Sequence, residues 1–215
     1  MVQKKGNTTA YREGLRLKIL DIASPIFKEN GINAVKMDDI ASELGISKRT
    51  LYELYSNKED LLYECIKHDS DKDREQMLHY SSIAENDMEL LAYFLISKMR
   101  ELEHISPCFL ESIHKYPKIV DFLNKRNEER AAEIDKVLKR GIENGYFIKD
   151  INYDILYELS DSMMTHVMQS RMYQKYTLKE ILITILTVQI RGCCTKSGME
   201  ALNKYMEKYN SVSNG

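Results

Sequence analysis

The amino-acid sequence predicts an all-α protein of about nine or ten helices, and three observations lead to this prediction. The chain has 215 residues but only 9 Gly and 3 Pro, too few for the frequent turns of a β-sandwich or barrel. Apolar residues recur at three-and-four spacing over most of its length, which is the period of an amphipathic helix. Residues that cap helices precede many of these segments, and we find no convincing strand pattern.

Four helices are expected in the amino-terminal part of the chain, where glycines that permit left-handed turns end helices and Ser side chains begin them. Leu15, Ile19 and Phe27 belong to one apolar stripe of the first helix. The four are expected from Tyr11 to Gly31, from Ile40 to Leu44, from Lys48 after the N-cap Ser47, and from Lys58 to roughly Tyr80 behind a capping box of Ser56 and Glu59.

The remainder of the chain is expected to be helical on the same grounds. Capping boxes of Asn or Thr with a Glu three residues later, and prolines suited to a first turn, mark the helix starts. These helices are expected from Asn86 to about Glu103, from Pro107 over a short stretch, from Pro117 to Gly145, from Tyr153 to Gln174, from Thr177 to about Gly192, and from Met199 to Tyr209.

The stretch from Ile40 to Leu54 meets the stereochemical demands of a helix-turn-helix. Its apolar residues fall where the two helices must face each other and the first helix. Ala41 is small where the helices cross most closely, and Gly45 suits the positive-φ position of the turn.

The second helix of this pair begins with an exposed polar turn made of Lys48, Arg49 and Thr50. Tyr52 lies one turn beyond Lys48. Two cations, a hydroxyl and a phenol therefore gather at the end of a helix that would enter a DNA major groove. A purely structural three-helix bundle would leave this exposed turn unexplained.

The chain as a whole has no electrostatic attraction to nucleic acid, because its formal net charge is −2. Basic residues nevertheless gather at the amino end, where Lys4 and Lys5 begin a series of cations opposed only by Glu13. We expect a basic arm over residues 1–10 that is either solvated or follows a DNA groove.

The sequence predicts no secretory leader and no membrane span. The most apolar stretch, Ile181–Ile190, is too short and too polar to cross a bilayer. The 4 cysteines show neither a CxxC pair nor the spacing of a zinc site, which fits reduced thiols in a cytoplasmic protein. The adjacent Cys193 and Cys194 could form a thiol switch or fill the core, and the sequence leaves both interpretations open.

The pattern of His and Glu residues does not support an enzyme. Glu101-x-x-His104 and Glu111-x-x-His114 resemble the pairs of di-iron helical bundles. Pro107 lies between these closely spaced pairs, so they cannot come from two long facing helices. Since catalytic motifs and Gly-rich phosphate loops are also missing, we expect no enzyme, no metal site and no cofactor.

A resemblance to a known family extends this interpretation. The segment from Gly31 to Leu62 resembles the DNA-binding domain of the tetracycline-repressor (TetR) family. Its sequence is GINAVKMDDIASELGISKRTLYELYSNKEDLL. Arg140–Asn152 and Ile185–Gly192 also resemble that family. The resemblance implies a homodimeric transcriptional regulator, usually a repressor, that leaves its operator when a small molecule binds its carboxyl-terminal domain. The matching marks are Asp39-Ile40-Ala41, Gly45-Ile46-Ser47, Thr50-Leu51-Tyr52, Tyr55 and Ser56-x-Lys58-Glu59-x-Leu61.

Carried over position by position, the resemblance implies that Lys48, Arg49 and Thr50 meet base edges or nearby phosphates. It implies that Tyr52 and Lys58 contact the DNA backbone, with Lys58 helped by the amino terminus of the fourth helix.

The chain departs from the family pattern at three positions. Glu53 and Leu54 stand where members often carry aromatic or His residues that touch DNA. Phosphate would repel Glu53, so this side chain either points away or accepts a hydrogen bond from a cytosine amino group. Met37 stands where a Thr or Ser often caps the second helix, which argues against a cap contact to phosphate.

We expect a DNA-binding domain at residues 1–56 and a helical effector-binding and dimerisation domain at residues 57–215. The inner helices of the second domain carry aromatic, Met and His residues, which fit an apolar or amphipathic effector, although Met residues also serve as adaptable core packing. The candidate lining residues are Phe94, Phe109, Tyr116, Phe122, Tyr157, Met163 and His166.

The last two long helices are expected to form a homodimer, as the resemblance implies. Ile181, Ile185, Val188 and Gly192 share one stripe of the second of them. A two-fold dimer would read an inverted-repeat operator, because one short recognition helix reads too few base pairs alone. The alternative is a DNA-bound structural or recruitment protein that has the same DNA-binding domain and no ligand.

Overall fold

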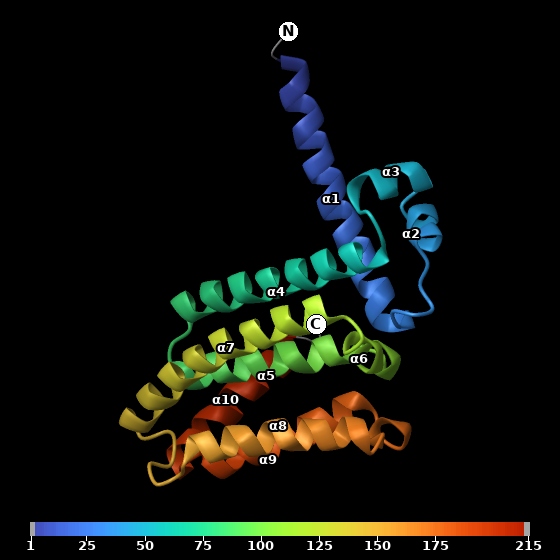
Figure 1. Cartoon of the computed structure of the whole chain (residues 1–215). Coiled ribbons are helices and arrows are strands. Elements are labelled where there is room, and N and C mark those ends of the chain that lie inside the picture. The colour runs from blue at the N-terminus through green and yellow to red at the C-terminus, as the bar shows by residue number, and fades with distance from the viewer. Residues whose placement is uncertain (1–2, 213–215) are drawn as a thin grey trace. The chain divides into compact units, whose positions relative to one another are not determined.

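The computed structural model describes residues 3–212, which form ten α-helices and one short 3₁₀ helix without a sheet (Figure 1). The all-α class is therefore confirmed. Side chains are described for residues 10–209, so those of Lys4 and Lys5 in the predicted basic arm lie outside the described residues. The helices are α1 (Gln3–Asn30), α2 (Met37–Glu43), α3 (Lys48–Leu54), α4 (Lys58–Ile83), α5 (Asp87–Glu103), α6 (Pro107–Ile113), α7 (Pro117–Glu143), α8 (Tyr153–Gln169), η1 (Met172–Gln174), α9 (Leu178–Cys193) and α10 (Lys196–Val212).

The chain divides into two compact units. Unit 1 contains the residues up to Glu75 together with His104–Leu123, and unit 2 contains Gln76–Glu103 and the residues from Asn124 onward. Helices α4 and α7 therefore contribute residues to both units. The functional boundary at residue 56 stays a prediction, because compactness alone does not assign function.

Unit 1 has a core to which α1, α2, α3, α4 and α6 all contribute. Phe27, Ile40, Leu51 and Leu61 are fully buried there, and Phe109 of α6 joins them. Helices α2 and α3 have only 7 residues each, too few to be stable alone. Their packing into this core is what keeps them folded.

Gly31 ends α1 as predicted. Its φ is +80°, in the left-handed region, and a Cβ at this position would lie 2.9 Å from the Cβ of Cys108 on α6. Gly31 is therefore required by the backbone conformation and by the close approach of α6.

One predicted capping residue and one predicted helix end were wrong. Asn57, not Ser56, caps α4, because the Asn57 Oδ1 accepts from the Asp60 N–H at 2.9 Å. Helix α8 ends at Gln169 instead of Gln174, since Arg171 adopts a left-handed conformation with φ 53° before η1 begins. The apolar spacing continues past the end of α8, and no glycine marks that end in the sequence.

The predicted capping box of Thr177 and Glu180 is confirmed in both halves, and that of Asn86 and Glu89 only in its N-cap half, because the Glu89 carboxylate accepts from the Glu85 N–H. Thr177 Oγ1 accepts from the Glu180 N–H at 3.2 Å, and the Glu180 carboxylate accepts from the Thr177 N–H at 2.8 Å. Asn86 Oδ1 accepts from the Glu89 N–H at 3.1 Å at the start of α5. These local pairs fix helix starts whatever the tertiary packing.

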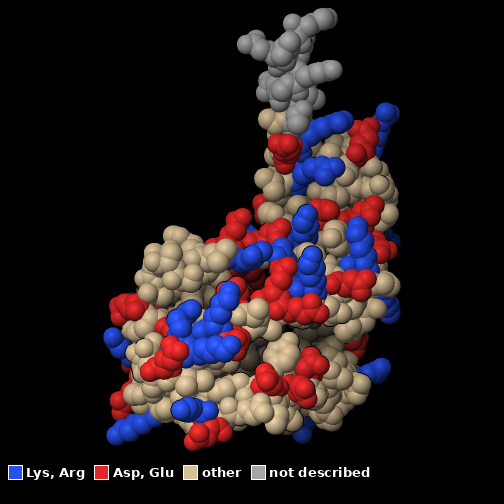
Figure 2. All heavy atoms as spheres, turned by 60° about the vertical axis from the view of Figure 1, so that its left-hand side comes forward, with Lys and Arg blue, Asp and Glu red and all other residues tan. Residues whose placement is uncertain are grey.

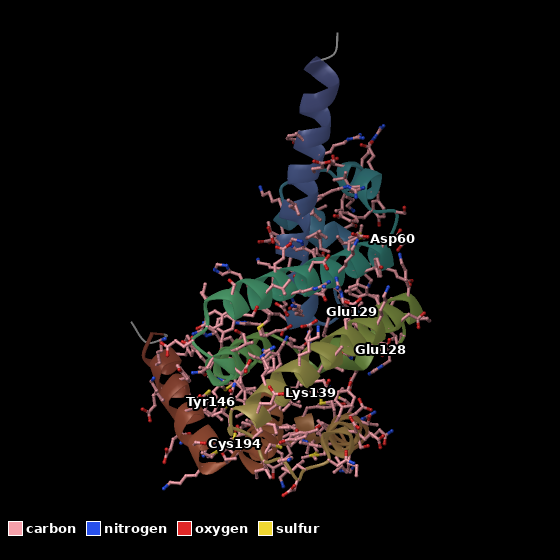
Figure 3. The ribbon with its side chains drawn as sticks, turned by 90° about the vertical axis from the view of Figure 1, so that its left-hand side faces the viewer. Asp60, Glu128, Glu129, Lys139, Tyr146 and Cys194 are labelled. Atoms are coloured by element: carbon pink, nitrogen blue, oxygen red, sulfur yellow. The ribbon has the colours of Figure 1, made fainter. Side chains whose placement is uncertain are left out.

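In unit 2, the turn after α7 is fastened to the junction of α9 and α10. Gly145 has φ +74°, and Phe147 packs onto Gly141, where a Cβ would lie 2.3 Å from the phenyl ring. Phe147 then forms an isolated antiparallel bridge with Cys194. Figure 3 shows the neighbouring Tyr146 close to Cys194.

The cysteines of this junction are packing residues by their surroundings. Cys193 and Cys194 are both buried and unbonded to each other. Burial raises the pKa of the Cys194 thiol to about 11, and burial also raises the pKa of Cys193. Protonated, buried thiols react slowly, which favours core filling over a thiol switch.

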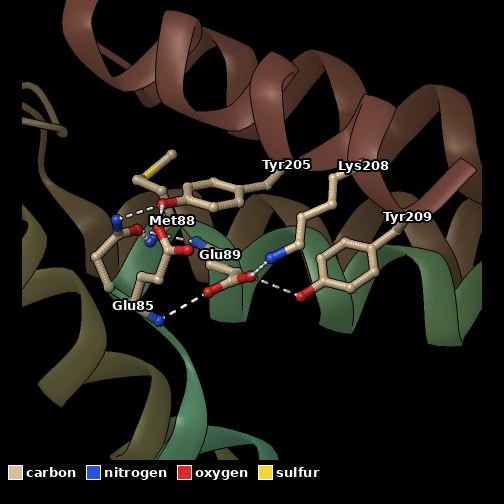
Figure 4. A network of polar contacts seen from close by, with 7 residues as sticks. Glu85, Met88, Glu89, Tyr205, Lys208 and Tyr209 are labelled. Carbon is tan, nitrogen blue, oxygen red and sulfur yellow. Dashed lines mark hydrogen bonds and ion pairs between the residues drawn. The ribbon is translucent and has the colours of Figure 1, made fainter. Parts of the chain in front are cut away.

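A polar network joins the start of α5 to α10 in unit 2 (Figure 4). The Glu89 side chain is buried, and its carboxylate accepts from Lys208 Nζ at 2.7 Å and from the Tyr209 hydroxyl at 2.9 Å. Its other oxygen accepts from the Glu85 N–H at 2.7 Å. Tyr205 donates its hydroxyl to the Glu85 carboxylate at 2.8 Å.

These contacts decide the ionisation of Glu89. Burial alone would raise its pKa, but the hydrogen bonds from Lys208 and from the Glu85 N–H outweigh burial, and the pKa is lowered. Glu89 therefore remains a carboxylate at neutral pH.

An aromatic cluster anchors the end of α4 in unit 2. Tyr80 stacks on Tyr93 with ring centroids 3.8 Å apart. Tyr209 meets the two rings edge-on, at 5.9 Å and 6.1 Å. Edge-on rings attract each other beyond their simple burial.

Replacing Glu89 with Gln should lower the free energy of unfolding by about 1.5–3 kcal/mol at pH 7, because charge-assisted hydrogen bonds are lost in a buried site. The native pKa of Glu89 lies below its unfolded value, so the contribution is full above about pH 5 and declines as the pH falls through the native pKa. Urea unfolding of both proteins between pH 3 and pH 7 measures this difference.

Glu200→Gln provides the matched control, since Glu200 is an exposed residue of α10. It should leave stability unchanged. A difference between Glu89→Gln and wild type that stays constant over the whole pH range would contradict the predicted role of the carboxylate.

Candidate nucleic-acid interface

The helix-turn-helix has the geometry that the sequence predicts. Gly45 has φ +63° in the turn, and the Ile46 N–H donates to the Ala41 carbonyl at 3.0 Å. Ile40 and Leu51 are fully buried between the helices and the core of unit 1. Figure 1 shows α2 and α3 beside α1. The turn therefore sets the direction in which α3 presents its outer face.

Ser47 caps α3 as predicted. Its Oγ accepts from the Thr50 N–H at 3.1 Å and lies 2.8 Å from the Thr50 hydroxyl. The cap fixes the first turn of α3, and it also engages Thr50, which is half-buried. Because a hydroxyl has one donor and two acceptor sites, the contact with Ser47 leaves the Thr50 hydroxyl able to meet a further partner.

Three of the predicted DNA-contacting residues are exposed together on the outer face of α3. The Lys48 side chain is 64% exposed and that of Arg49 is 88% exposed. Tyr52 is 49% exposed, whereas the neighbouring Leu51 is buried. This face can therefore approach another molecule without rearrangement of the core.

Both cations of this face are paired with acids of the same unit. Lys48 forms an ion pair with Asp38 of α2, and Arg49 Nε donates to the Glu53 carboxylate at 2.9 Å. The hydrogen bond and the charge of Glu53 raise the pKa of Arg49. Sequence reasoning missed both pairs, although the four-residue spacing of Arg49 and Glu53 indicated one.

Lys58 lies apart from that face and has partners in its own unit. Its ammonium donates to the Ile32 carbonyl at 2.9 Å and to the Val35 carbonyl at 3.1 Å. These bonds tie the α1–α2 connection to the start of α4. An ammonium has three donors, so one remains for a phosphate.

Arg16 supports the far end of α3. Its guanidinium donates to the Leu54 carbonyl at 3.2 Å and lies 5.5 Å from the centroid of the Tyr55 ring. Burial raises the pKa of Tyr55 to about 12, although the charge of Arg16 acts in the other direction. A cavity of about 190 Å³ adjoins this contact and includes Asp60 and Lys118 in its lining. No local pattern in the sequence indicated that Arg16 meets α3.

Helix α2 begins with Met37, which is buried. The preceding residue, Lys36, donates its N–H to the Asp39 carboxylate at 3.1 Å. The first turn of α2 thus carries Asp38 and Asp39, which disfavour a phosphate at this position.

The predicted ligand-lining residues do not lie in one unit. Phe109, Tyr116 and Phe122 belong to the core of unit 1 or pack against it. Phe94 is half-buried in unit 2. Tyr157, Met163 and His166 of α8 are exposed.

A different set of residues surrounds a small cavity between α5, α9 and α10 in unit 2. It measures about 20 Å³, and sequence reasoning singled out none of its lining residues. In the sequence, these lining residues could be recognised only as members of the apolar stripe of each helix. They are Leu95, Met99, Leu102, Ile183, Leu186, Thr187 and Met206.

Helices α8 and α9 expose large apolar side chains. Ile155, Leu159 and Met163 recur at four-residue spacing along α8 and are 55%, 51% and 37% exposed. On α9, Val188 is 66% exposed, whereas Ile181 of the same predicted stripe is buried. Met163 Sδ lies 4.0 Å from Nε2 of Gln189, so the two helices are neighbours.

The described residues contain no group of three His, Cys, Asp or Glu side chains arranged to hold a metal ion. His104 instead lies 3.7 Å from the Glu29 carboxylate of α1. Among the helices described, none is long and apolar enough to cross a membrane.

Comparison with known proteins gives consistent similarities. Residues 19–65 match the family described as bacterial regulatory proteins, tetR family. The HTH-type transcriptional repressor KstR2 of Mycobacterium tuberculosis is 25% identical over 194 residues, which cover 86% of this chain and 94% of that protein.

Two solved structures share the fold. A transcriptional regulator from Saccharomonospora viridis in complex with choline has a TM-score of 0.69 at 19% identity, covering 86% of this chain and 100% of the other. The transcriptional regulator FadR from Bacillus subtilis in complex with stearoyl-CoA has a TM-score of 0.57 at 20% identity, covering 82% and 98%.

The family match covers the helix-turn-helix whose geometry is described above, and the repressor relative aligns along most of the chain. Residues 19–65 thus match the tetR family, and over most of its length the chain is similar to a transcriptional repressor.

Proposed function

We propose that the protein is a homodimeric repressor that leaves an inverted-repeat operator when a small-molecule effector binds it. The observation that carries the proposal is the exposed face of α3, with Lys48, Arg49 and Tyr52 presented from a turn that Ser47 and Gly45 fix. An exposed basic turn on a rigid helix-turn-helix suits the edges of bases in a major groove.

Within this proposal the basic side chains have separate roles. Arg49 donates to a base edge, since a guanidinium matches the two acceptors of guanine. Lys48, Thr50 and Tyr52 contact bases or phosphates beside it, and Lys58 offers its remaining donor to a phosphate. Phosphate contacts give affinity, whereas the Arg49 contact gives sequence preference.

We infer that the apolar side chains on α8 and α9 form the dimer interface. Ile155, Leu159 and Val188 are large and exposed, and a two-fold axis would bury each against the partner subunit. DNA would select the dimer whose two recognition helices lie about 34–36 Å apart, one turn of duplex. An effector that favours another spacing would release the operator.

The effector class is proposed from the cavity of unit 2. Its lining is apolar except for Thr187, and Met99 and Met206 have the flexible side chains that let a pocket enlarge. Choline and stearoyl-CoA occupy two structural neighbours, which supports a small-molecule effector here. We propose an apolar or amphipathic molecule.

A second candidate function has a specific observation in its favour. A cavity of about 20 Å³ has space for a water molecule but not for an organic effector. A DNA-bound structural or recruitment protein without a ligand would need no larger space. In both candidates the protein acts on DNA in the cytoplasm and is not an enzyme.

Selection of bound duplexes from a randomised DNA library, at fixed salt, should enrich an inverted repeat. This is expected because a two-fold dimer presents two copies of α3. No enrichment by a protein shown to be folded and dimeric, even after refolding to remove a retained ligand, would overturn the proposed function.

Arg49→Ala should weaken operator binding by about 1–3 kcal/mol and relax preference at one base pair in each half-site. Lys58→Ala should instead weaken binding to all sequences alike. Affinities for the operator and its single-base variants measure both effects. Thermal denaturation must accompany Lys58→Ala, since two hydrogen bonds to backbone carbonyls are also lost. Unchanged base preference in Arg49→Ala would exclude its base contact.

Val188→Asp should dissociate the dimer, because it introduces a charge into an apolar interface at a cost on the order of 3 kcal/mol, or about 100-fold in the dissociation constant. Analytical ultracentrifugation measures this effect. Ile134→Asp is the control, because Ile134 is an exposed residue of α7 outside the proposed interface. Equal dimer stability in the two variants would place the interface elsewhere.

A thermal-shift screen should distinguish the two candidate functions. An effector at 100 times its Kd adds about 2.7 kcal/mol of stability to the folded protein. The screen should include long-chain acyl-CoA compounds and quaternary amines, and each hit should also release the operator. Stabilisation without operator release would favour the second candidate, a structural or recruitment protein that has no ligand. The absence of any hit among apolar and amphipathic compounds would favour it too.

A further inference from the structure

We propose that Asp38 and Glu53 are selectivity residues that weaken binding to non-specific DNA by holding Lys48 and Arg49 in ion pairs. This inference rests on the proposed DNA-binding function. The operator would compensate for the loss of these pairs with contacts to its bases, whereas other DNA would not.

The charge of the helix-turn-helix is the first observation. Between Met37 and Leu54 the only cations are Lys48 and Arg49, against four acids. Non-specific binding depends on cations that neutralise phosphates and release counterions. A helix-turn-helix with more acids than bases is therefore poorly suited to bind DNA without regard to sequence. The four acids are Asp38, Asp39, Glu43 and Glu53.

The positions of the acids are the second observation. Asp38 reaches Lys48 across the turn, from α2 to α3, while Glu53 reaches Arg49 along α3 itself. Each of the two cations thus has one carboxylate of its own. Figure 2 shows the same mixture over the visible surface, where acidic side chains lie beside basic ones.

The exposure of these pairs argues against a mainly structural role. The Asp38 and Glu53 side chains are 46% and 50% exposed. Ion pairs at such exposure contribute little to stability. Their main effect is on the charge that the face presents to an approaching molecule.

A matched base sequence can replace what the ion pairs provide. Guanine O6 and N7 accept two hydrogen bonds from Arg49 in place of the Glu53 carboxylate. The freed Glu53 carboxylate can then accept from a cytosine amino group, so both partners of the pair find new ones. A phosphate satisfies Arg49 alone and repels Glu53. The energetic penalty therefore falls on non-specific DNA.

Glu53→Gln and Asp38→Asn test the proposal, because each removes the charge and keeps the shape. Binding to the selected operator and to a random duplex of equal length should be measured between 50 and 300 mM salt. Each variant should bind the random duplex more tightly, with a salt dependence steeper by about 0.9 for the cation released. The ratio of operator to random affinity should fall about tenfold for Glu53→Gln.

Glu43→Gln is the matched control. Glu43 is an exposed residue of α2, and its substitution removes the same charge but neither ion pair. Tighter binding with the wild-type salt slope is expected of it. Misfolding cannot mimic the expected result, because that result is a gain of binding.

If Glu53→Gln and Asp38→Asn behave like Glu43→Gln, the selectivity role is wrong while the proposed function stands. If Glu53→Gln weakens binding to both the operator and the random duplex, the carboxylate supports the fold and the proposal is overturned. If the wild-type protein binds no duplex at any salt concentration, the proposed function and this inference both fail.

Discussion

The packing of α3 is the constraint on which the candidate DNA-facing surface depends. A helix of 7 residues does not hold its shape in water, so α3 needs Leu51 in the core, Ser47 at its amino end and Arg16 at its carboxyl end. Leu51 fixes how deeply α3 packs against the core, Ser47 fixes where the helix begins, and Arg16 fixes where it ends. With these fixed, the rotation of α3 about its axis is set, and Arg49 has to face outward.

The sharp turn between α2 and α3 also places acidic side chains beside the cations of this surface. Because Gly45 turns the chain sharply, α2 and α3 lie close enough for Asp38 to reach Lys48. The turn that presents the cations therefore also supplies an acid to one of them. Under the selectivity role that we propose, the same contacts set affinity for DNA and discrimination between sequences, and strengthening one weakens the other.

Local rules explain which features the sequence could predict. Gly31, Gly45 and the Thr177–Glu180 pair act within one turn of the chain, and their roles are legible from residue type and spacing. Features that depend on backbone groups far away in the sequence could not be predicted. Lys58 meets carbonyls more than twenty residues away, and Arg171 turns left-handed without the glycine that usually marks such a position.

The structure does not bring the predicted ligand-lining residues together in one unit, and the small cavity of unit 2 is lined by other residues. The polar network at Glu89 holds the first turn of α5 to α10, whereas the cavity lies along the later turns, at Leu95 and Met99. A molecule that enlarges the cavity must therefore displace the later turns or the Met side chains while the network holds the start. Aromatic residue type, by which Tyr157 was selected, does not report on this difference. What matters is which part of a helix can yield, and that follows from the contacts of Glu89.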